Sequence, residues 1–339
     1  MRIAINGFGR IGKSFFRVLL ANPEAWRHID VVAINVGPND PSLIPYAIKY
    51  DTIMGTLDED IQYKDGLLSV KGKQITVCAE RDPGDAPWKD LAVDWVVDCS
   101  GTCTERERAE RHCIGGAGHV LISAPACDED ITIIPGVNDE KLDTSKHIIV
   151  SLGSCTTNAL LPVIKVLHES FELTSGYMTT IHSYTNTQKL LDVDPKAKDP
   201  RRSRAAALNI IPTTTGAAAL VGKIMPELEG KVTARAVRVP VAAVSLIDFT
   251  FTGQRDFDAS LINEVLGKTS ARQTQRIIAL SDEPLVSSDY VLNPYSVTIA
   301  TDLTSTVGGL GKVFGWYDNE WGYSCRLKDF LMKCVQEGC

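Results

Sequence analysis

Short apolar runs alternate with helical patterns through the first half of the chain. Five of these runs predict strands: Arg2–Asn6, Val31–Asn35, Val93–Asp98, His119–Ser123 and His147–Ser151. Their nearly continuous apolar character is typical of a parallel sheet covered by helices on both faces. The stretch from Arg10 to Ala21 predicts the first crossover helix, and Asn22-Pro23 should end it, because the residue before a proline avoids the helical conformation.

The second half has a different pattern. Three longer segments rich in β-branched residues predict strands of an antiparallel sheet: Thr174–Tyr184, Thr233–Pro240 and Val244–Thr252. A polar, basic loop lies between the first two, from about Gln188 to Arg204. Near the C-terminus, apolar residues recur at helical spacing and predict a final helix: Leu327, Phe330, Leu331, Cys334 and Val335.

These patterns predict an α/β protein of two domains. Residues 1–153 should form a domain with a Rossmann-type parallel sheet. Residues 154–318 should form an α+β domain with a mostly antiparallel sheet. The last helix, over about 319–339, is expected to pack back onto the first domain.

Composition narrows the class of protein. The 339 residues carry a net charge of -7, which argues against a nucleic-acid surface. No apolar run approaches the roughly 18 residues of a membrane span, and no secretion signal is recognisable, so a cytoplasmic protein is expected. The nine cysteines are irregularly spaced. Cys99 and Cys103 suggest a metal or redox pair, but free thiols in a reducing cytoplasm fit better, and no metal is expected.

The N-terminal glycine loop fits two kinds of nucleotide site. Gly7, Gly9 and Gly12 follow a strand, open a helix and match the dinucleotide fingerprint, which places the pyrophosphate at the helix N-terminus. The span Gly7–Ser14 also matches the phosphate loop of NTPases, with Asp98 available as the magnesium-binding acid. The three glycine offsets favour the dinucleotide, but this loop leaves both readings open.

The second strand ends at Asn35-Val36-Gly37, where the dinucleotide fingerprint usually has an acid that bonds the adenosine ribose. The nearest carboxylate, Asp40, lies several residues further on. Without a carboxylate in place, the 2′-phosphate of NADP would not be repelled. The choice between NAD and NADP therefore stays open.

A cysteine and a histidine are candidates for nucleophilic chemistry. Cys155 follows a strand and precedes an apolar, helix-like stretch, so the helix N-terminus should lower the pKa of its thiol. Pro162 predicts a kink in that helix or a short first turn. His182 ends a predicted strand. If His182 pairs with Cys155, it would activate the thiol and then act as acid or base.

Six segments, in order along the chain, carry a family resemblance. They read I-N-G-F-G-R-I-G, S-C-T-T-N, T-T-I-H-S-Y-T, I-I-P-T-T-T-G-A-A, R-V-P and W-Y-D-N-E-W-G-Y-S. Together they resemble glyceraldehyde-3-phosphate dehydrogenase of the phosphorylating, bacterial type and cover nearly the whole chain. The resemblance demotes the NTPase reading, because Lys13 stands where relatives commonly have arginine.

The resemblance implies a role for each matching residue. It implies Cys155 as the nucleophile and His182 as its base, with a thioester formed on Cys155, hydride transfer to NAD(P) and release of 1,3-bisphosphoglycerate by inorganic phosphate. It implies a substrate and phosphate site made of Ser154, Thr156, Thr185, Arg202, Thr215, Gly216 and Arg238. It implies cofactor contacts from Gly7, Phe8, Gly9, Arg10, Ile11, Asn35, Val36, Arg81, Ser123, Asn319 and Tyr323. A homotetramer is also implied.

Departures from the family pattern affect the cofactor. Val36 stands where NAD-specific relatives have aspartate, so relaxed use of NAD and NADP is expected. The loop Leu191–Pro200 is about two residues longer than in typical bacterial members. In the family this loop reaches a neighbouring subunit's cofactor, so Asp194 is expected to influence cofactor choice.

Three rival functions remain to be weighed. Erythrose-4-phosphate dehydrogenase shares the catalytic pair, but those enzymes tend to lose the Thr-Gly that this chain keeps at Thr215-Gly216. The P-loop NTPase reading rests on Gly7–Ser14 alone. The third rival, a cofactor-binding protein with a non-catalytic role, is disfavoured by the intact Cys155 and His182.

Overall fold

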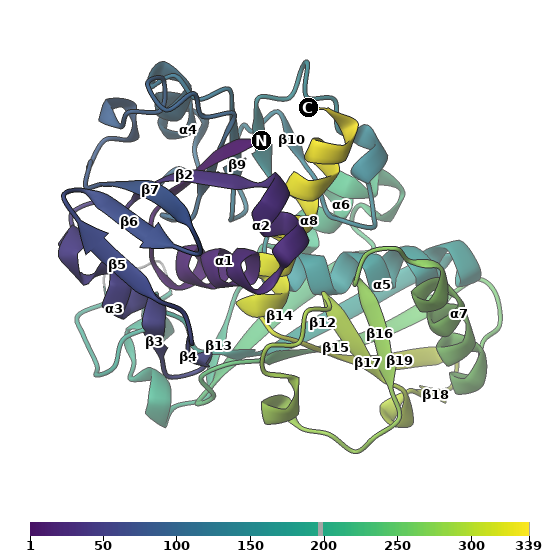
Figure 1. Cartoon of the computed structure of the whole chain (residues 1–339). Coiled ribbons are helices and arrows are strands. Elements are labelled where there is room, and N and C mark those ends of the chain that lie inside the picture. The colour runs from purple at the N-terminus through teal and green to yellow at the C-terminus, as the bar shows by residue number, and fades with distance from the viewer. Residues whose placement is uncertain (196–198, 339) are drawn as a thin grey trace. The chain divides into compact units, whose positions relative to one another are not determined.

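The computed structural model describes residues 1–195 and 199–338. The chain folds into two compact units. The first contains Met1–Ser154 together with the segment that begins at Ser324, and the second contains Cys155–Tyr323. Figure 1 shows the two sheets and the helices that flank them.

The first unit is built on a nine-stranded sheet of order β10-β11-β9-β8-β1-β2-β7-β6-β5. Its strands are β1 (Arg2–Asn6), β2 (Asp30–Asn35), β5 (Ile61–Lys64), β6 (Leu67–Val70), β7 (Lys73–Cys78), β8 (Trp95–Asp98), β9 (His119–Ile122), β10 (Ile131–Thr132) and β11 (Ile149–Ser151). From β10 to β7 every pairing is parallel, as a Rossmann-type sheet requires. A short ribbon of β3 (Tyr50–Asp51) and β4 (Gly55–Thr56) lies outside this sheet.

The antiparallel edge β7-β6-β5 was not predicted from the sequence. Its two tight turns are Asp65-Gly66 and Lys71-Gly72, and all four residues have positive φ, at 51°, 81°, 45° and 76°. Two successive residues of positive φ suit the twist of a two-residue hairpin. Asx-Gly at the first turn was therefore an available signal.

Helices of the first unit are α1 (Arg10–Ala21), α2 (Pro23–His28), α3 (Ile44–Lys49), α4 (Arg106–Ile114) and, from Ser324 onward, α8 (Trp321–Glu337). Short 3-10 turns are η1 (Pro41–Leu43), η2 (Pro83–Asp85) and η3 (Asp139–Lys141). The bounds predicted for α1 are confirmed. Asn22 ends α1 and caps α2, because its side chain accepts a hydrogen bond from Ala25 N.

The second unit is built on an eight-stranded sheet of order β13-β14-β12-β15-β19-β17-β16, with β18 paired to β19. Its strands are β12 (Leu173–Ser183), β13 (Ile211–Thr213), β14 (Val232–Val239), β15 (Ser245–Gly253), β16 (Ile278–Ser281), β17 (Val297–Ala300), β18 (Ser305–Val307) and β19 (Leu310–Tyr317). The pairs β12–β14 and β16–β17 are parallel and the others are antiparallel. The predicted fold class is confirmed.

Helices of the second unit are α5 (Cys155–Phe171), α6 (Ala217–Ile224) and α7 (Ala259–Arg272), with 3-10 turns η4 (Pro200–Ser203), η5 (Ala206–Leu208), η6 (Pro226–Leu228), η7 (Ser287–Tyr290) and η8 (Thr301–Leu303). Helix α5 continues through Pro162, so the predicted alternative of a short first turn is wrong. The predicted insertion Leu191–Pro200 lies partly outside the described residues. No helix in the described ranges is long and apolar enough to cross a membrane.

Candidate active site

Cys155 and His182 meet at the ends of two elements of the second unit. Cys155 is the first residue of α5, and His182 is the penultimate residue of β12. The Cys155 Sγ lies 3.6 Å from the His182 Nε2, which is hydrogen-bonding distance for sulfur. His182 is only 4% exposed. A thiol beside an imidazole is an arrangement that can produce a nucleophile.

The other ring nitrogen of His182 sits in a tight triangle of polar atoms. Its Nδ1 lies 2.7 Å from the Ser183 carbonyl oxygen and 2.7 Å from the Arg238 Nη1, which itself donates to that oxygen at 2.8 Å. A carbonyl oxygen has two lone pairs and can accept from both groups. An arginine can only donate, so its short contact would make Nδ1 an acceptor, whereas the Ser183 carbonyl oxygen calls for a proton on Nδ1. The tautomer with the proton on Nδ1 needs Arg238 to donate to Ser183 alone, and it is the one that leaves the Nε2 lone pair facing the Cys155 thiol.

The helix N-terminus was expected to lower the pKa of the Cys155 thiol, but a stronger effect opposes it. Burial raises the pKa of the Cys155 thiol above its usual value, although the charge of Arg238 and hydrogen bonds with Thr156 oppose it. The predicted lowering is therefore wrong in its net direction. Burial and the charge of Arg238 lower the pKa of His182 to about 3. Burial thus disfavours the charged form of both groups.

Tyr317, the last residue of β19, supports the start of α5. Its hydroxyl lies 3.0 Å from the Thr156 Oγ1 and 2.8 Å from the Thr180 Oγ1. Burial raises the pKa of Tyr317 well above its usual value, so the phenol stays protonated. The hydroxyl of Thr156, beside Cys155, is thereby held in a fixed orientation. Tyr317 was not singled out from the sequence, although it lies within the quoted W-Y-D-N-E-W segment.

Two arginines form a cationic patch next to this pair. Burial lowers the pKa of Arg238 below its usual value, and the nearby charge of Arg202 lowers it further. Arg202 donates to the Thr213 Oγ1 at 2.8 Å and to the Thr214 carbonyl oxygen at 3.1 Å. The two positively charged guanidinium groups repel each other, and an anion bound to both would relieve this repulsion.

The remaining predicted anion contacts lie on nearby segments of the second unit, except Ser154. The strand β13 pairs with β14 so that Ile211 faces Arg238, and Thr215 and Gly216 follow β13 directly. The Thr215 Oγ1 accepts from Ala217 N at 3.3 Å, at the start of α6. Thr185 lies just beyond β12, and its hydroxyl contacts that of Thr187. Ser154 is the last residue of the first unit's N-terminal segment and is partly buried.

In the first unit, the glycine loop has the tight packing of a dinucleotide fingerprint. Gly7 has a φ of +86°, and a Cβ there would lie 2.5 Å from the Ser100 backbone. A Cβ on Gly12 would lie 2.3 Å from the Gly7 carbonyl oxygen, whereas one on Gly9 would meet nothing within 4 Å. The open space at Gly9 is what the approach of a pyrophosphate needs.

The phosphate-loop interpretation of the same segment fails at Ser14. Its side chain is fully buried, whereas a phosphate loop presents this hydroxyl to magnesium. Phe8 packs edge-on against Phe16, with ring centroids 5.9 Å apart. Arg10 opens α1 and forms an ion pair with the buried Asp51. The partly buried Ile11 follows Arg10 in the first turn of α1.

Comparison with known proteins identifies the family to which the chain is similar. The family model for the NAD binding domain of glyceraldehyde 3-phosphate dehydrogenase matches residues 1–106, and the model for its C-terminal domain matches residues 154–319. The chain is 46% identical over 333 residues to glyceraldehyde-3-phosphate dehydrogenase 2 of Streptomyces avermitilis, covering 98% of both proteins. It is 45% identical over 341 residues to glyceraldehyde-3-phosphate dehydrogenase of Geobacillus stearothermophilus, covering 100% of this chain and 99% of that protein.

The chain belongs to the glyceraldehyde 3-phosphate dehydrogenase family. It is thus an oxidoreductase with an NAD-binding domain, and the family resemblance found in the sequence is confirmed. The cradle of glycines described above fits the pyrophosphate of that cofactor.

Three asparagine and aspartate side chains join the strand ends beneath the glycine loop of this dehydrogenase. The Asn35 Nδ2 donates to the Asn6 Oδ1 at 2.8 Å, and the Asn6 Nδ2 donates to the Asp98 Oδ2 at 2.7 Å. The Asn35 Oδ1 accepts from Gly37 N and Glu80 N at 3.1 and 2.9 Å. Asn35 therefore fixes the backbone on both sides of Val36 and at Glu80, the residue before Arg81.

Val36 is 7% exposed, and its backbone N–H donates to the Cys78 carbonyl oxygen at 2.9 Å. Arg81 comes three residues after the end of β7, next to this strand end, and its side chain is exposed. Ser123 follows β9, and its N–H donates to the Asp98 carbonyl oxygen at 3.0 Å. In the second unit, Asn319 follows β19 and the buried Tyr323 lies in the first turn of α8.

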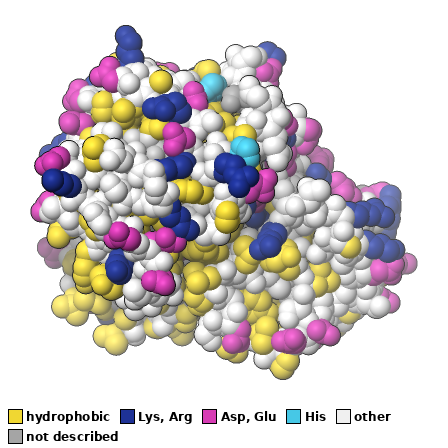
Figure 2. Space-filling model, in the orientation of Figure 1, with side chains coloured by type: hydrophobic (Ala, Val, Ile, Leu, Met, Phe, Trp, Pro, Cys, Tyr) yellow, Lys and Arg dark blue, Asp and Glu magenta, His cyan; other side chains and the backbone are white. Residues whose placement is uncertain are grey.

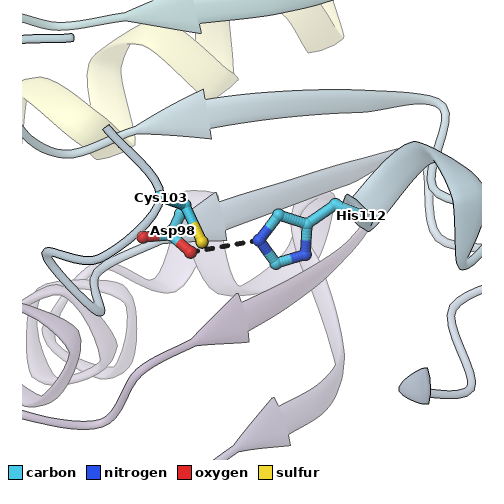
Figure 3. A group of neighbouring side chains, drawn as sticks. All are labelled: Asp98, Cys103 and His112. Carbon is cyan, nitrogen blue, oxygen red and sulfur yellow. Dashed lines mark hydrogen bonds and ion pairs between the residues drawn. The ribbon is translucent and has the colours of Figure 1, made fainter. Parts of the chain in front are cut away.

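Asp98, Cys103 and His112 form a buried group with the spacing of metal ligands (Figure 3). The His112 Nε2 lies 3.0 Å from the Asp98 Oδ2, and the Trp88 Nε1–H donates to the His112 Nδ1 at 3.2 Å. An indole nitrogen only donates, so Nδ1 is the acceptor and the proton lies on Nε2, facing Asp98. To bind a metal beside Asp98, His112 would need an unprotonated Nε2, with its proton on Nδ1. The observed arrangement has the proton on Nε2, so this group is better suited to a structural role.

The carboxylate of Asp98 is the centre of this hydrogen-bonded group. Its Oδ1 accepts from the Ser100 Oγ at 2.8 Å and from Ser100 N at 3.1 Å, in addition to the two donors on Oδ2. Burial by itself raises the pKa of Asp98, but hydrogen bonds from His112, Asn6 and Ser100 outweigh it, so the pKa lies below its usual value. Burial raises the pKa of the Cys103 thiol to about 12, and Cys103 carries no disulfide.

Proposed function

We propose that this enzyme oxidises D-glyceraldehyde 3-phosphate to 1,3-bisphosphoglycerate through a thioester on Cys155. The distance of 3.6 Å between the Cys155 Sγ and the His182 Nε2 is the observation that supports this most directly. His182 takes the thiol proton, and the thiolate adds to the aldehyde carbon. The protonated His182 then returns that proton to the new oxyanion, which gives a hemithioacetal and leaves His182 neutral. NAD, when bound, accepts the hydride from that carbon.

The remaining steps use the same two side chains. His182 removes the hydroxyl proton of the hemithioacetal as the C–H bond breaks, which leaves the thioester. An oxygen of inorganic phosphate then attacks the thioester carbon, the C–S bond breaks, and the Cys155 thiolate is restored. Covalent capture divides one difficult oxidation into two easier steps.

The cationic patch supports recognition of two anions. Arg238 and Arg202 supply charge for the substrate's phosphate, together with the hydroxyl of Thr185. Ser154, Thr156, Thr215 and Gly216 supply hydroxyl and N–H donors for inorganic phosphate. Arg238 leaves the triangle with His182 and Ser183 when it binds an anion, and the positive charge beside His182 is then partly neutralised.

The experiment is a steady-state assay of Cys155→Ser with and without phosphate. The variant should lose turnover and keep NAD binding, because a serine hydroxyl is a far weaker nucleophile than a thiolate. The control is Cys127→Ser, since Cys127 is an exposed free thiol. Full activity of Cys155→Ser would refute the mechanism. Faster turnover of erythrose 4-phosphate without phosphate would favour the erythrose-4-phosphate dehydrogenase alternative.

NADP is proposed as a second cofactor beside NAD. Val36 puts no negative charge at the strand end where a 2′-phosphate would lie, and the exposed Arg81 stands on the neighbouring strand end. Comparison of kcat/KM for NAD and NADP tests this. Val36→Asp should reduce kcat/KM for NADP at least tenfold by charge repulsion, a change of about 1.4 kcal/mol. A wild-type preference for NAD by several orders of magnitude would refute relaxed specificity.

We further propose that the protein is a homotetramer in the cytoplasm. Its dinucleotide-binding domain would comprise residues 1–153 and its catalytic domain residues 154–318. Apolar side chains are exposed on the surface, as Figure 2 shows for one face. The second unit alone exposes Leu190, Leu191, Leu208 and Ile210 by 79%, 70%, 79% and 70%. Exposed apolar groups of this size are typical of subunit interfaces. Light scattering that gives the mass of a monomer would refute the tetramer.

A further inference from the structure

Three buried polar side chains meet at the ends of adjacent strands in the second unit. Ser183 is the last residue of β12, Ser245 is the first of β15, and Asn319 follows β19; these strands are neighbours in the sheet. The Ser183 Oγ donates to the Asn319 Oδ1 at 2.8 Å, and the Ser245 Oγ donates to the same atom at 3.2 Å. The three residues are 0%, 1% and 5% exposed.

The polarity of these bonds fixes which way the Asn319 amide points. The Ser183 N–H donates to the Ser245 Oγ at 3.1 Å, so the proton of the Ser245 hydroxyl is directed elsewhere. If the amide were turned round, the Ser183 hydroxyl could donate to the Ser245 Oγ, 3.4 Å away, but the Ser245 hydroxyl would have no acceptor among these three side chains. Buried hydroxyl donors without an acceptor are unfavourable, so the orientation with Oδ1 toward the serines is preferred.

The backbone around Asn319 is also fixed. Tyr317 is held by Thr156 and Thr180. The Asp318 carboxylate accepts hydrogen bonds from the N–H groups of Glu320, Trp321 and Leu292 at 2.9, 2.9 and 2.8 Å. With both lone pairs of Oδ1 used by the serines, Asn319 offers a ligand only its Nδ2 hydrogens.

We propose that Ser183 and Ser245 are positioning residues that lock Asn319 as a hydrogen-bond donor toward the carbonyl oxygen of the nicotinamide carboxamide. This inference rests on the proposed function, in which NAD is the hydride acceptor, and on the family resemblance, which implies that Asn319 contacts the nicotinamide amide. The inference also predicts the specificity of the site. The substituent on the pyridine ring of the cofactor must carry a hydrogen-bond acceptor, whereas the NH2 group of the carboxamide is not required.

Ser183 contacts both His182, the proposed base, and Asn319, the proposed cofactor contact. Its backbone carbonyl oxygen accepts from the His182 Nδ1, which orients the base, and its side chain orients Asn319. One residue thereby aligns the group that removes the proton with the group that holds the hydride acceptor. A shift of Ser183 would therefore disturb both groups.

The test compares two cofactors that differ only in the NH2 group. NAD has a carboxamide, and its 3-acetylpyridine analogue keeps the carbonyl oxygen but has a methyl group in place of NH2. Dissociation constants for both are measured by calorimetry on wild type, Ser183→Ala, Ser245→Ala and the double variant. Ser175→Ala is the matched control, because the hydroxyl of this serine of β12 contacts that of Thr252 at 2.7 Å, away from Asn319.

Wild type and Ser175→Ala should bind the two cofactors with similar affinity, within about threefold. In the double variant the amide can turn, and its Oδ1 can still pair with the NH2 of NAD but repels the acetyl oxygen. The ratio of the two dissociation constants should therefore rise about tenfold. General loosening of the fold would weaken both cofactors and leave the ratio unchanged.

An unchanged ratio in the double variant, with thermal stability like that of the single variants, would overturn the inference. Cofactor binding that is insensitive to Asn319→Ala would also overturn it. Neither result touches the thioester mechanism, which is judged separately by the loss of turnover in Cys155→Ser.

Discussion

The buried group around Asp98 allows a stability prediction that can be worked through quantitatively. His112→Phe keeps the ring volume but removes both nitrogens. The Trp88 Nε1–H, in a fully buried side chain, then has no acceptor, and Asp98 loses the donor at 3.0 Å. An orphaned buried donor costs about 1–3 kcal/mol and a lost bond to a charged group about 1.5–3 kcal/mol, so the expected destabilisation is about 3–5 kcal/mol.

Thermal unfolding followed by circular dichroism measures this effect. For a unit of this size, 1 kcal/mol corresponds to about 2–4 °C, so the Tm should fall by about 10 °C. The control is His119→Phe, because this partly buried histidine of the same unit has one hydrogen bond, 3.0 Å to the Thr144 carbonyl oxygen. The control should lose no more than about 4 °C. Equal Tm values for wild type and His112→Phe would refute the assigned polarity of the group.

Three further outcomes are expected. The pKa of Asp98 is lower in the folded protein than the unfolded value of 3.8. The ionised carboxylate therefore stabilises the fold above pH 3.8, and this stabilisation is lost as the pH falls through the folded pKa. The Tm difference between wild type and His112→Phe should therefore shrink in acid. Gly12→Ala should lower the Tm, because its Cβ would lie 2.3 Å from the Gly7 carbonyl oxygen, whereas Gly9→Ala should keep the Tm and weaken NAD binding in calorimetry. Tyr317→Phe should lower kcat about tenfold by releasing Thr156 and Thr180, and a steady-state assay with unchanged kcat would contradict this role.

Much of the first unit was predictable from its sequence, because parallel strands buried on both faces leave a simple apolar pattern. The bounds of β1 and α1 were predicted correctly, and β2 and β9 differ by one residue. The strand predicted from Val93 begins instead at Trp95. Ala92, with a φ of 47°, forms a turn just before it, and nothing in the apolar pattern marks that turn.

The pairing of strands in the second unit was less accessible. β12 and β14 are parallel neighbours although long segments separate them, and such non-local pairing is invisible to local periodicity. The pKa of Cys155 could likewise not be predicted from local sequence. Its position at a helix N-terminus was predicted, but the rise in its pKa depends on burial, which only the folded chain supplies. Ser183 and Ser245 went unnoticed because isolated serines carry no sequence signal.

The return of α8 to the first unit has a consequence for how this protein is made. Phe330 packs edge-on against Trp95, with ring centroids 5.3 Å apart, and the Lys333 Nζ donates to the Asp139 carbonyl oxygen at 2.9 Å. The NAD-binding unit therefore cannot close its core while its last residues are still inside the ribosome. The catalytic unit is synthesised completely before its predecessor can finish folding, which reverses the usual N-terminal-first order. A nascent chain stalled before Ser324 should expose Trp95 and need a chaperone.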